Sequence, residues 1–324
     1  LAYLDGLVHD LRDQIPAALK EFDEAAIHKS RVATRRLKSA VDLLAPILSE
    51  KHRKPFAEAG KKLRRKLGPL RDLDVMIGHL EALGKVQKYA EICKWLIESL
   101  KHDREEARSD ASKKSTSAGT LARLGAWWGV RDEISECTDA IPHLLAEAIH
   151  LGLDHFSEQA DWLTGVRKAP DELVATQDPH ELRIAGKALR YTLEMAGEQG
   201  QPLPAAVLKQ FKKMQELLGV WHDYVVLTDN ALTAAHEHQL VLHKPLLANQ
   251  ILELSRMTLA RSAKELNRFY DLWKKEGATL ALTIRDRFPL SQPVVKEGGL
   301  TPVVDQGNNV RNNVHNEGGT HDPH

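Results

Sequence analysis

The segment His28-Lys-Ser-Arg-Val-Ala-Thr-Arg-Arg-Leu-Lys38 returns near residue 180 as His180-Glu-Leu-Arg-Ile-Ala-Gly-Lys-Ala-Leu-Arg190. In both copies a histidine is followed by cations at i+3, i+7 and i+10, with apolar residues between them. At about 100° per residue, these four positions fall within an arc of roughly 80° on a helix. Each copy is therefore predicted to be an amphipathic helix with a stripe of like charge. Because like charges at i,i+4 destabilise a helix by a few tenths of a kcal/mol, a stripe present twice indicates an anion-binding surface.

Helical periodicity extends from Tyr3 to about Arg287, and strand-like alternation is almost absent. The sequence therefore predicts an all-α protein. The expected helices span 3–22, 25–48, 51–67, 70–83, 86–116, 119–136, 141–164, 172–198, 203–218, 221–238, 242–275 and 279–287. The pair Gly68-Pro69 is predicted to end one helix and begin the next, because proline favours the first helical position.

The repeat extends beyond the opening motif. Leu67-Gly-Pro-Leu-Arg-Asp72 corresponds to Leu218-Gly-Val-Trp-His-Asp223, and Ile15-Pro-Ala-Ala-Leu19 corresponds to Ile141-Pro-His-Leu-Leu145. We expect two duplicated helical-bundle modules of antiparallel helices with short loops. Their predicted bounds are 1–138 and 139–288, followed by a flexible tail at 289–324 that is rich in Gly, Asn and Pro. Asp72 and Asp223 are predicted to be charges near helix starts, paired with Arg71 or His222.

The composition limits the function classes. The 324 residues include 45 basic and 45 acidic side chains, which argues against a general polyanion binder of the histone type. The segment 28–71, however, holds 14 Lys and Arg against 3 acidic residues, and such segregation can create a strong local field. The alternative, which composition alone favours, is an ordinary solvated helical surface.

Other sequence features bear on compartment and metal binding. Cys93 and Cys137 are the only cysteines, so neither a disulfide framework nor a thiolate metal site is expected, and a reducing compartment fits. No apolar run approaches the roughly 20 residues that span a bilayer, and no signal-peptide pattern is seen. We expect a cytoplasmic protein without a membrane partner.

The cations expected to bind the anion lie on matched helices of the two halves. Arginine contacts phosphate oxygens with a planar fork, lysine adds a point charge, and a helical turn of about 5.4 Å spaces them along an extended anion. In the first half they are His28, Arg31, Arg35, Arg36, Lys38, Lys61, Lys62, Arg64, Arg65, Lys66, Arg104 and Arg108. In the second half they are His180, Arg183, Lys187, Arg190, Lys209, Lys212 and Lys213. For each histidine, phosphate contact and helix packing both remain open.

A helix with the pattern His-x-x-Arg-[Val/Ile]-x-x-[Arg/Lys] occurs twice, and each copy is followed by Leu-Gly-x-x-[Arg/His]-Asp. With this doubled pattern, the chain resembles the conserved histidine α-helical domain (CHAD) family over about 3–288. The resemblance implies two four-helix-type bundles about a pseudo-twofold axis, with a basic central groove or pore that binds inorganic polyphosphate. It assigns this binding to the histidines and cations of the two motif helices. The two halves of the chain differ in charge at four aligned positions. Arg36, Arg64, Arg65 and Lys66 align with Ala188, Gln215, Glu216 and Leu217, so the first half is expected to contribute more.

Catalytic motifs do not accompany the cation stripes. The sequence lacks a Gly-rich phosphate loop, an HExxH pair and a GxSxG elbow, and it lacks the clustered carboxylates that would hold Mg²⁺ for hydrolysis. We therefore predict a non-catalytic binder of polyphosphate, with no cofactor or metal and with polyphosphate granules as one expected location. Two alternatives stay open. One is single-stranded nucleic-acid binding, against which the lack of interleaved aromatic residues argues; the other is a scaffold whose basic face docks an acidic protein.

Overall fold

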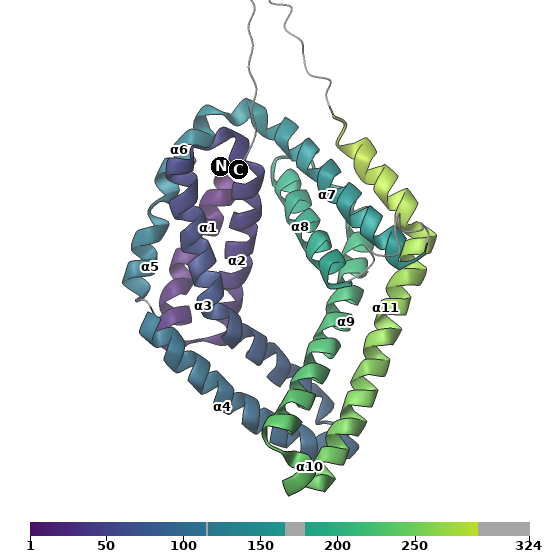
Figure 1. The fold of residues 1–324 in the computed structure, drawn as a ribbon. Helices are drawn as coiled ribbons and strands as arrows, with labels where there is room; N and C mark the ends of the chain where they lie inside the picture. The colour runs from purple at the N-terminus through teal and green to yellow at the C-terminus, as the bar shows by residue number, and fades with distance from the viewer. Residues whose placement is uncertain (115, 166–178, 291–324) are drawn as a thin grey trace, which may run out of the picture. The chain divides into compact units, whose positions relative to one another are not determined.

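The computed structural model describes residues 1–114, 116–165 and 179–290. These residues form helices and their connections without any strand, which confirms the all-α prediction (Figure 1). The helices are α1 (Ala2–Pro16), α2 (Glu24–Leu43), α3 (Glu50–Leu83), α4 (Ala90–Lys114), α5 (Ser117–Leu124), α6 (Trp127–Glu136), α7 (Ile141–Leu163), α8 (Pro179–Glu198), α9 (Ala205–Glu237), α10 (Leu240–His243) and α11 (Pro245–Arg287). A π-helical segment, Ala17–Glu21, continues α1.

The first motif helix, α2, is set by its N-terminal cap. Phe22 adopts a left-handed conformation with φ of 58°, which turns the chain after α1. The carboxylate of Asp23 then accepts a hydrogen bond from the backbone N–H of Ala26 at 2.7 Å, as favourable N-caps do. The helix buries Ile27, Leu37 and other apolar residues and leaves the cation stripe on its opposite side.

Several predicted helix boundaries are wrong. The helix α3 runs through Gly68-Pro69 without interruption, although an interior proline removes a backbone hydrogen bond. Gly68 is buried against α2, where a Cβ atom would lie 3.0 Å from the Arg31 guanidinium, so this glycine permits close helix packing rather than a turn. Likewise α9 and α11 are continuous where breaks were expected, whereas the predicted helix 119–136 is divided at Gly125. The predicted start of α8 at 172 lies outside the described residues.

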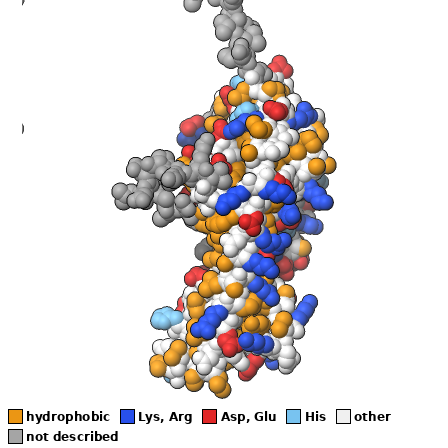
Figure 2. Space-filling view, turned by 90° about the vertical axis from the view of Figure 1, so that its right-hand side faces the viewer, with side chains coloured by type: hydrophobic (Ala, Val, Ile, Leu, Met, Phe, Trp, Pro, Cys, Tyr) orange, Lys and Arg blue, Asp and Glu red, His pale blue; other side chains and the backbone are white. Residues whose placement is uncertain are grey.

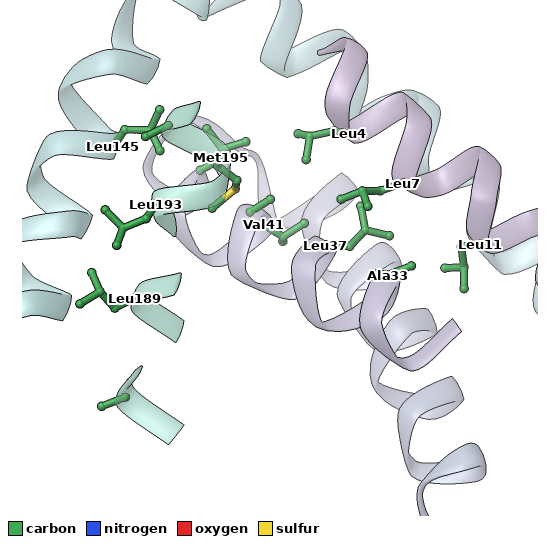
Figure 3. Close-up of a cluster of buried hydrophobic side chains, with 14 of the residues drawn as sticks. Leu4, Leu7, Leu11, Ala33, Leu37, Val41, Leu145, Leu189, Leu193 and Met195 are labelled. Carbon is green, nitrogen blue, oxygen red and sulfur yellow. The ribbon is translucent and has the colours of Figure 1, made fainter. Parts of the chain in front are cut away.

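The motif helices are joined by a shared apolar core. Within the first half α2 packs between α1 and α3, and within the second half α8 packs between α7 and α9. The helix α2 also contacts α7 and α8, so leucines of α1 and α2 belong to the same core as those of α7 and α8 (Figure 3). Residues of that core shown in Figure 3 include Leu7, Leu37, Leu145, Leu189 and Leu193. This packing places the polar faces of the two motif helices near each other.

A second apolar cluster joins the far ends of the long helices. It brings together Leu80 of α3, Ile92 of α4, Leu227 of α9 and Ile251 of α11. The pairs α3–α4 and α9–α11 therefore extend away from the main core and meet near α10 (Figure 1).

Residues Leu1–Leu290 form one compact unit. The predicted module boundary at 138/139 falls in the short 3₁₀ turn Thr138–Ala140 between α6 and α7. The division into two modules, their duplication and the pseudo-twofold axis stay predictions, and residues 291–324 of the predicted tail lie outside the described residues. Among the described helices, none has both the length and the apolar character that crossing a membrane requires.

Candidate anion-binding site

The stripe on α2 is held in place by α3. The Arg31 guanidinium donates a hydrogen bond to the backbone carbonyl of Arg64 at 3.2 Å, and it lies 3.3 Å from a carboxylate oxygen of Asp72. Burial lowers the pKa of Arg31, Asp72 opposes that shift, and the nearby cations Arg35, Arg71 and Arg64 add to it. The Arg31 side chain is only 11% exposed, so its charge lies inside the site.

The stripe on α8 repeats this arrangement. The guanidinium of Arg183 lies 4.0 Å from one oxygen of Asp223 on α9, and the imidazole of His79 lies 3.4 Å from the other oxygen. Burial is the main cause that lowers the pKa of Arg183. Its Nε atom is buried without a hydrogen-bond partner among the described residues.

The expectation that Asp72 and Asp223 mark helix starts is wrong. Both lie in the interior of long helices, α3 and α9, because neither helix breaks at its Leu-Gly motif. Their carboxylates contact the motif arginines Arg31 and Arg183 of the preceding motif helix, rather than their sequence neighbours Arg71 and His222. Each aspartate thus lies beside an arginine of the stripe, closer in the first half (3.3 Å) than in the second (4.0 Å).

The two stripes approach each other directly. Arg36 of α2 donates a hydrogen bond from Nε to Glu194 of α8 at 3.1 Å, and Arg190 lies 3.4 Å from the other oxygen of that carboxylate. The field of Arg35 on α2 reaches α8, where it lowers the pKa of both Arg183 and Lys187 in addition to burial. We call Arg31, Arg35, Arg183, Lys187 and Arg190 the central cluster.

Lys187 shows how strongly positive this region is. Burial and the neighbouring charges of Arg183, Arg35 and Arg190 lower its pKa from 10.5 to about 7, against the opposing effect of Asp223. Its ammonium has no ion pair with any residue in the described parts of the chain. An ammonium in this position gains from any anion that enters the site.

The histidines of the second half pack against each other. The rings of His180 and His222 lie 4.8 Å apart between centroids. Burial and the charges of Arg183 and His180 lower the pKa of His222 to about 4. In the first half, burial and Arg71 lower the pKa of the exposed His28. His180 therefore has a packing contact, while His28 is open to a ligand; whether either contacts phosphate stays a prediction.

Several other predicted ligands are engaged elsewhere. Arg104 lies 2.5 Å from Asp74 and donates to the carbonyl of Phe22 at 3.1 Å, and Arg108 lies over the Phe22 ring at 5.6 Å. Arg64 donates to the carbonyl of Thr34 at 2.7 Å, and burial lowers its pKa. These three arginines bind the protein's own groups in the structure.

The remaining predicted lysines and arginines are spread along the surface. Lys38 pairs with Asp42 and Lys61 with Glu58, while Arg65 is exposed. Burial lowers the pKa of Lys66. The others line two hollows of the surface. Lys62 lies in one of them beside Arg123, and the other, between α9 and α11, is lined by Lys209, Lys212 and Lys213.

Sequence reasoning did not include Arg71, His222 and Glu194 in the site. The first two occupy matched places in the repeated Leu-Gly-x-x-[Arg/His]-Asp motif, so the repeat itself was the signal for them. For Glu194 the i,i+4 spacing from Arg190 was a local signal, whereas its contact with Arg36 is remote in sequence. Within 1–114, 116–165 and 179–290, His, Cys, Asp and Glu side chains do not gather in groups of three or more that would suit a metal ion.

Comparisons with known proteins identify the family and the fold. The family model of the CHAD domain matches residues 2–232, and the match ends within α9. The chain is also similar to the crystal structure of the CHAD domain from the plant Ricinus communis, with 20% identity over 88% of each chain and a TM-score of 0.54, which shows a shared fold. No curated protein matches the sequence. Since the family model covers well over half of its residues, the chain belongs to the CHAD family.

Proposed function

We propose that the chain binds inorganic polyphosphate at the central cluster without hydrolysing it. One observation carries the proposal: α2 packs against α8, and Arg36 and Arg190 share the carboxylate of Glu194 there. In the same region, the charge of Arg35 adds to burial in lowering the pKa values of Arg183 and Lys187. Two cation stripes that are remote in sequence thus act as one partly buried positive region. Such a region is electrostatically unfavourable when empty, and a polyanion stabilises it.

The depth of the cluster favours a thin anion. The Arg183 side chain is only 16% exposed, and its buried Nε has no described partner. A phosphate chain is narrow and carries charge on every unit, so it reaches such donors, whereas the carboxylates of a folded acidic partner reach them less easily. Charge-assisted pairs between guanidinium and phosphate are also among the strong hydrogen bonds.

Aromatic contacts argue against a nucleic-acid site at the cluster. Tyr191 is buried and lies under Arg190, whose guanidinium carbon is 5.2 Å from the ring centroid. Trp221 is half-buried and packs on His222 at 5.9 Å. Single-stranded nucleic acid is usually held by aromatic rings with a free face for each base. These rings contact protein groups instead.

The absence of hydrolysis is part of the proposal. Among the described residues, three carboxylates contact the cluster, and each has a cationic partner: Asp72 lies beside Arg31, Asp223 beside Arg183 and His79, and Glu194 beside Arg36 and Arg190. Metal-assisted phosphoryl chemistry needs carboxylates that are open to Mg²⁺. We further propose that the protein acts without a cofactor, in the cytoplasm and at polyphosphate granules.

The test is a competition at fixed salt between long-chain polyphosphate and single-stranded RNA, with orthophosphate release followed in parallel. We expect polyphosphate to displace RNA and no phosphate to be released, with or without Mg²⁺. If about 6–8 phosphates are contacted, the log–log dependence of affinity on salt should have a slope near −4 to −6, by analogy with single strands. Tighter RNA binding, a flat salt response or sustained phosphate release contradicts the proposal.

A further inference from the structure

A basic hollow lies between α9 and α11, apart from the central cluster. It has a volume of about 650 Å³, and its charged lining consists of Lys209, Lys212, Lys213, Arg268, Glu216 and Glu265. Arg268 is paired with Glu265 at 2.7 Å. The three lysines have no ion-pair partner within the described part of the chain. We call this hollow the outer groove.

The cations of α11 extend the outer groove. Arg261, Lys264 and Arg268 follow a spacing of i, i+3 and i+7, which places them on one face of α11, and all three are exposed. Figure 2 views the side of the molecule that carries α11 and shows Lys and Arg side chains in a band down this surface. The helix α11 lies beyond residues 2–232, which the CHAD family model matches.

The outer groove is separate from the central cluster along α9. Lys212 precedes His222, which packs at the central cluster, by ten residues in the same uninterrupted helix. At a rise of 1.5 Å per residue this corresponds to about 15 Å along the helix axis. An anion shorter than this separation spans only one of the two places, whereas a long chain has the length to reach both.

The lining indicates the kind of anion. Unpaired lysines suit phosphate groups as point charges, and Arg268 adds a planar donor fork. The ring of Tyr224, one helical turn beyond Val220 of the lining, already contacts Arg261 at 5.8 Å and His79 at 6.1 Å, so it does not offer a free face to a nucleobase. We propose that the outer groove is a second phosphate-chain site, which a long polyphosphate occupies together with the central cluster; the ligand identity rests on the proposed function.

The experiment is calorimetric titration with tripolyphosphate, which is too short to bridge both sites, and then with long-chain polyphosphate. Wild-type protein should bind two tripolyphosphates. Lys212→Ala with Lys213→Ala should bind one and lose about tenfold or more in affinity for the long chain, because linked sites gain from effective concentration. For this double variant, the slope of log affinity against log salt concentration should fall by about 1.4 in magnitude, or about 0.7 for each lost contact.

A matched control removes the same charge elsewhere. Lys85 and Lys94 are exposed and lie near the turn between α3 and α4. Lys85→Ala with Lys94→Ala should keep both tripolyphosphate sites and the wild-type affinity for the long chain. Circular dichroism should show unchanged helicity in both double variants, since all four positions are exposed.

The outcomes separate this inference from the proposed function. If the wild-type chain binds only one tripolyphosphate, and Lys212→Ala with Lys213→Ala does not change that binding, the outer-groove proposal is overturned and the central-cluster proposal is unaffected. If Lys212→Ala with Lys213→Ala abolishes polyphosphate binding, while Arg31→Ala with Arg35→Ala retains it in full, the groove is supported as a site and the central cluster is contradicted. Tighter binding of single-stranded RNA than of polyphosphate at the groove overturns the choice of ligand.

Discussion

The two motif-helix pairs, α2 with α3 and α8 with α9, have the same layout and different acid–base chemistry. In the first pair, Arg35 stands seven residues after the motif histidine, and Arg71 precedes the aspartate of the Leu-Gly motif. In the second pair the matched positions are Lys187 and His222, whose pKa values are lowered to about 7 and about 4 by burial and neighbouring cations. Arginine keeps its charge in proteins, whereas buried lysine and histidine readily lose theirs.

On the proposed function, this difference would give the two halves separate tasks. The first half presents a charge that does not depend on pH near neutrality. In the second half, the charge of Lys187 depends on both pH and the presence of an anion, because an anion favours the protonated ammonium. On the proposed function, two helix pairs of similar layout would then offer the anion a constant charge and a proton-linked charge. The predictions below test this contrast, from the largest expected effect to the smallest.

The largest effect should come from removing two cations of one stripe. Arg31→Ala with Arg35→Ala should weaken polyphosphate binding by about a hundredfold or more, because each charge-assisted contact contributes about 1.5–3 kcal/mol. Arg183→Ala with Lys187→Ala should weaken it less near pH 7.5, where Lys187 is only partly protonated in the free protein. Equilibrium binding measures both losses.

Helical content and melting temperature serve as controls for that comparison, and we expect small changes in both. Equal losses in the two double variants contradict the asymmetry while leaving polyphosphate binding in place. The difference between the affinity losses of the two double variants should widen as the pH rises from 7 to 9, since only the second stripe loses charge there.

The pH dependence of affinity should trace to Lys187. Its pKa in the free protein is about 7, and a bound anion raises it, so binding takes up a proton between the free and bound values. Affinity should therefore be highest below pH 7 and should fall by at most about tenfold per pH unit above it. Lys187→Arg should flatten this dependence, because arginine stays charged.

Titration calorimetry in buffers of different ionisation enthalpy gives an independent check of that prediction. Wild-type protein should take up a fraction of a proton near pH 8, and Lys187→Arg should take up less. The same pH slope in both proteins contradicts the assignment to Lys187.

A single matched pair of substitutions compares the Leu-Gly motifs. Arg71→Gln should weaken binding about tenfold at pH 7.5, the equivalent of about 1.4 kcal/mol for one charged contact. His222→Gln should change affinity by less than about threefold, because lowering its pKa to about 4 leaves the imidazole neutral at this pH. Fluorescence anisotropy with labelled polyphosphate measures both, and a larger loss in His222→Gln would reverse the contrast.

The smallest effect concerns the link between the halves. Arg36 of α2 and Glu194 of α8 lie 3.0 Å apart and are partly exposed, so their coupling should be about 1 kcal/mol or less. Arg36→Ala and Glu194→Gln should each lower the melting temperature by a few degrees, and a double-mutant cycle should show that the losses are not additive. Additive losses mean that the pair does not couple the helices. Affinity for polyphosphate should fall less in Arg36→Ala than in Arg35→Ala.

The local parts of this protein follow from its sequence. Apolar spacing near 3.6 predicts amphipathic helices, and the repeated His-x-x-Arg pattern predicts the cation stripes of α2 and α8, because both properties depend on neighbours within a few turns. The stop predicted at Gly68-Pro69 failed for the opposite reason. A long-range contact, the approach of Arg31 to Gly68, uses the glycine for packing within a continuous helix.

Only the tertiary structure decided how these parts form a site. Sequence assigned Arg36, Arg64 and Arg104 to the ligand, a prediction that stays open, and only the fold shows that they contact Glu194, Thr34 and Asp74. The pairing of Asp72 with Arg31 depends on α2 lying beside α3. The pKa of Lys187 depends on burial and on Arg35 from a remote segment. Partners and desolvation are properties of residues that meet in space, so a pattern read along the chain identifies the charges but not what they contact.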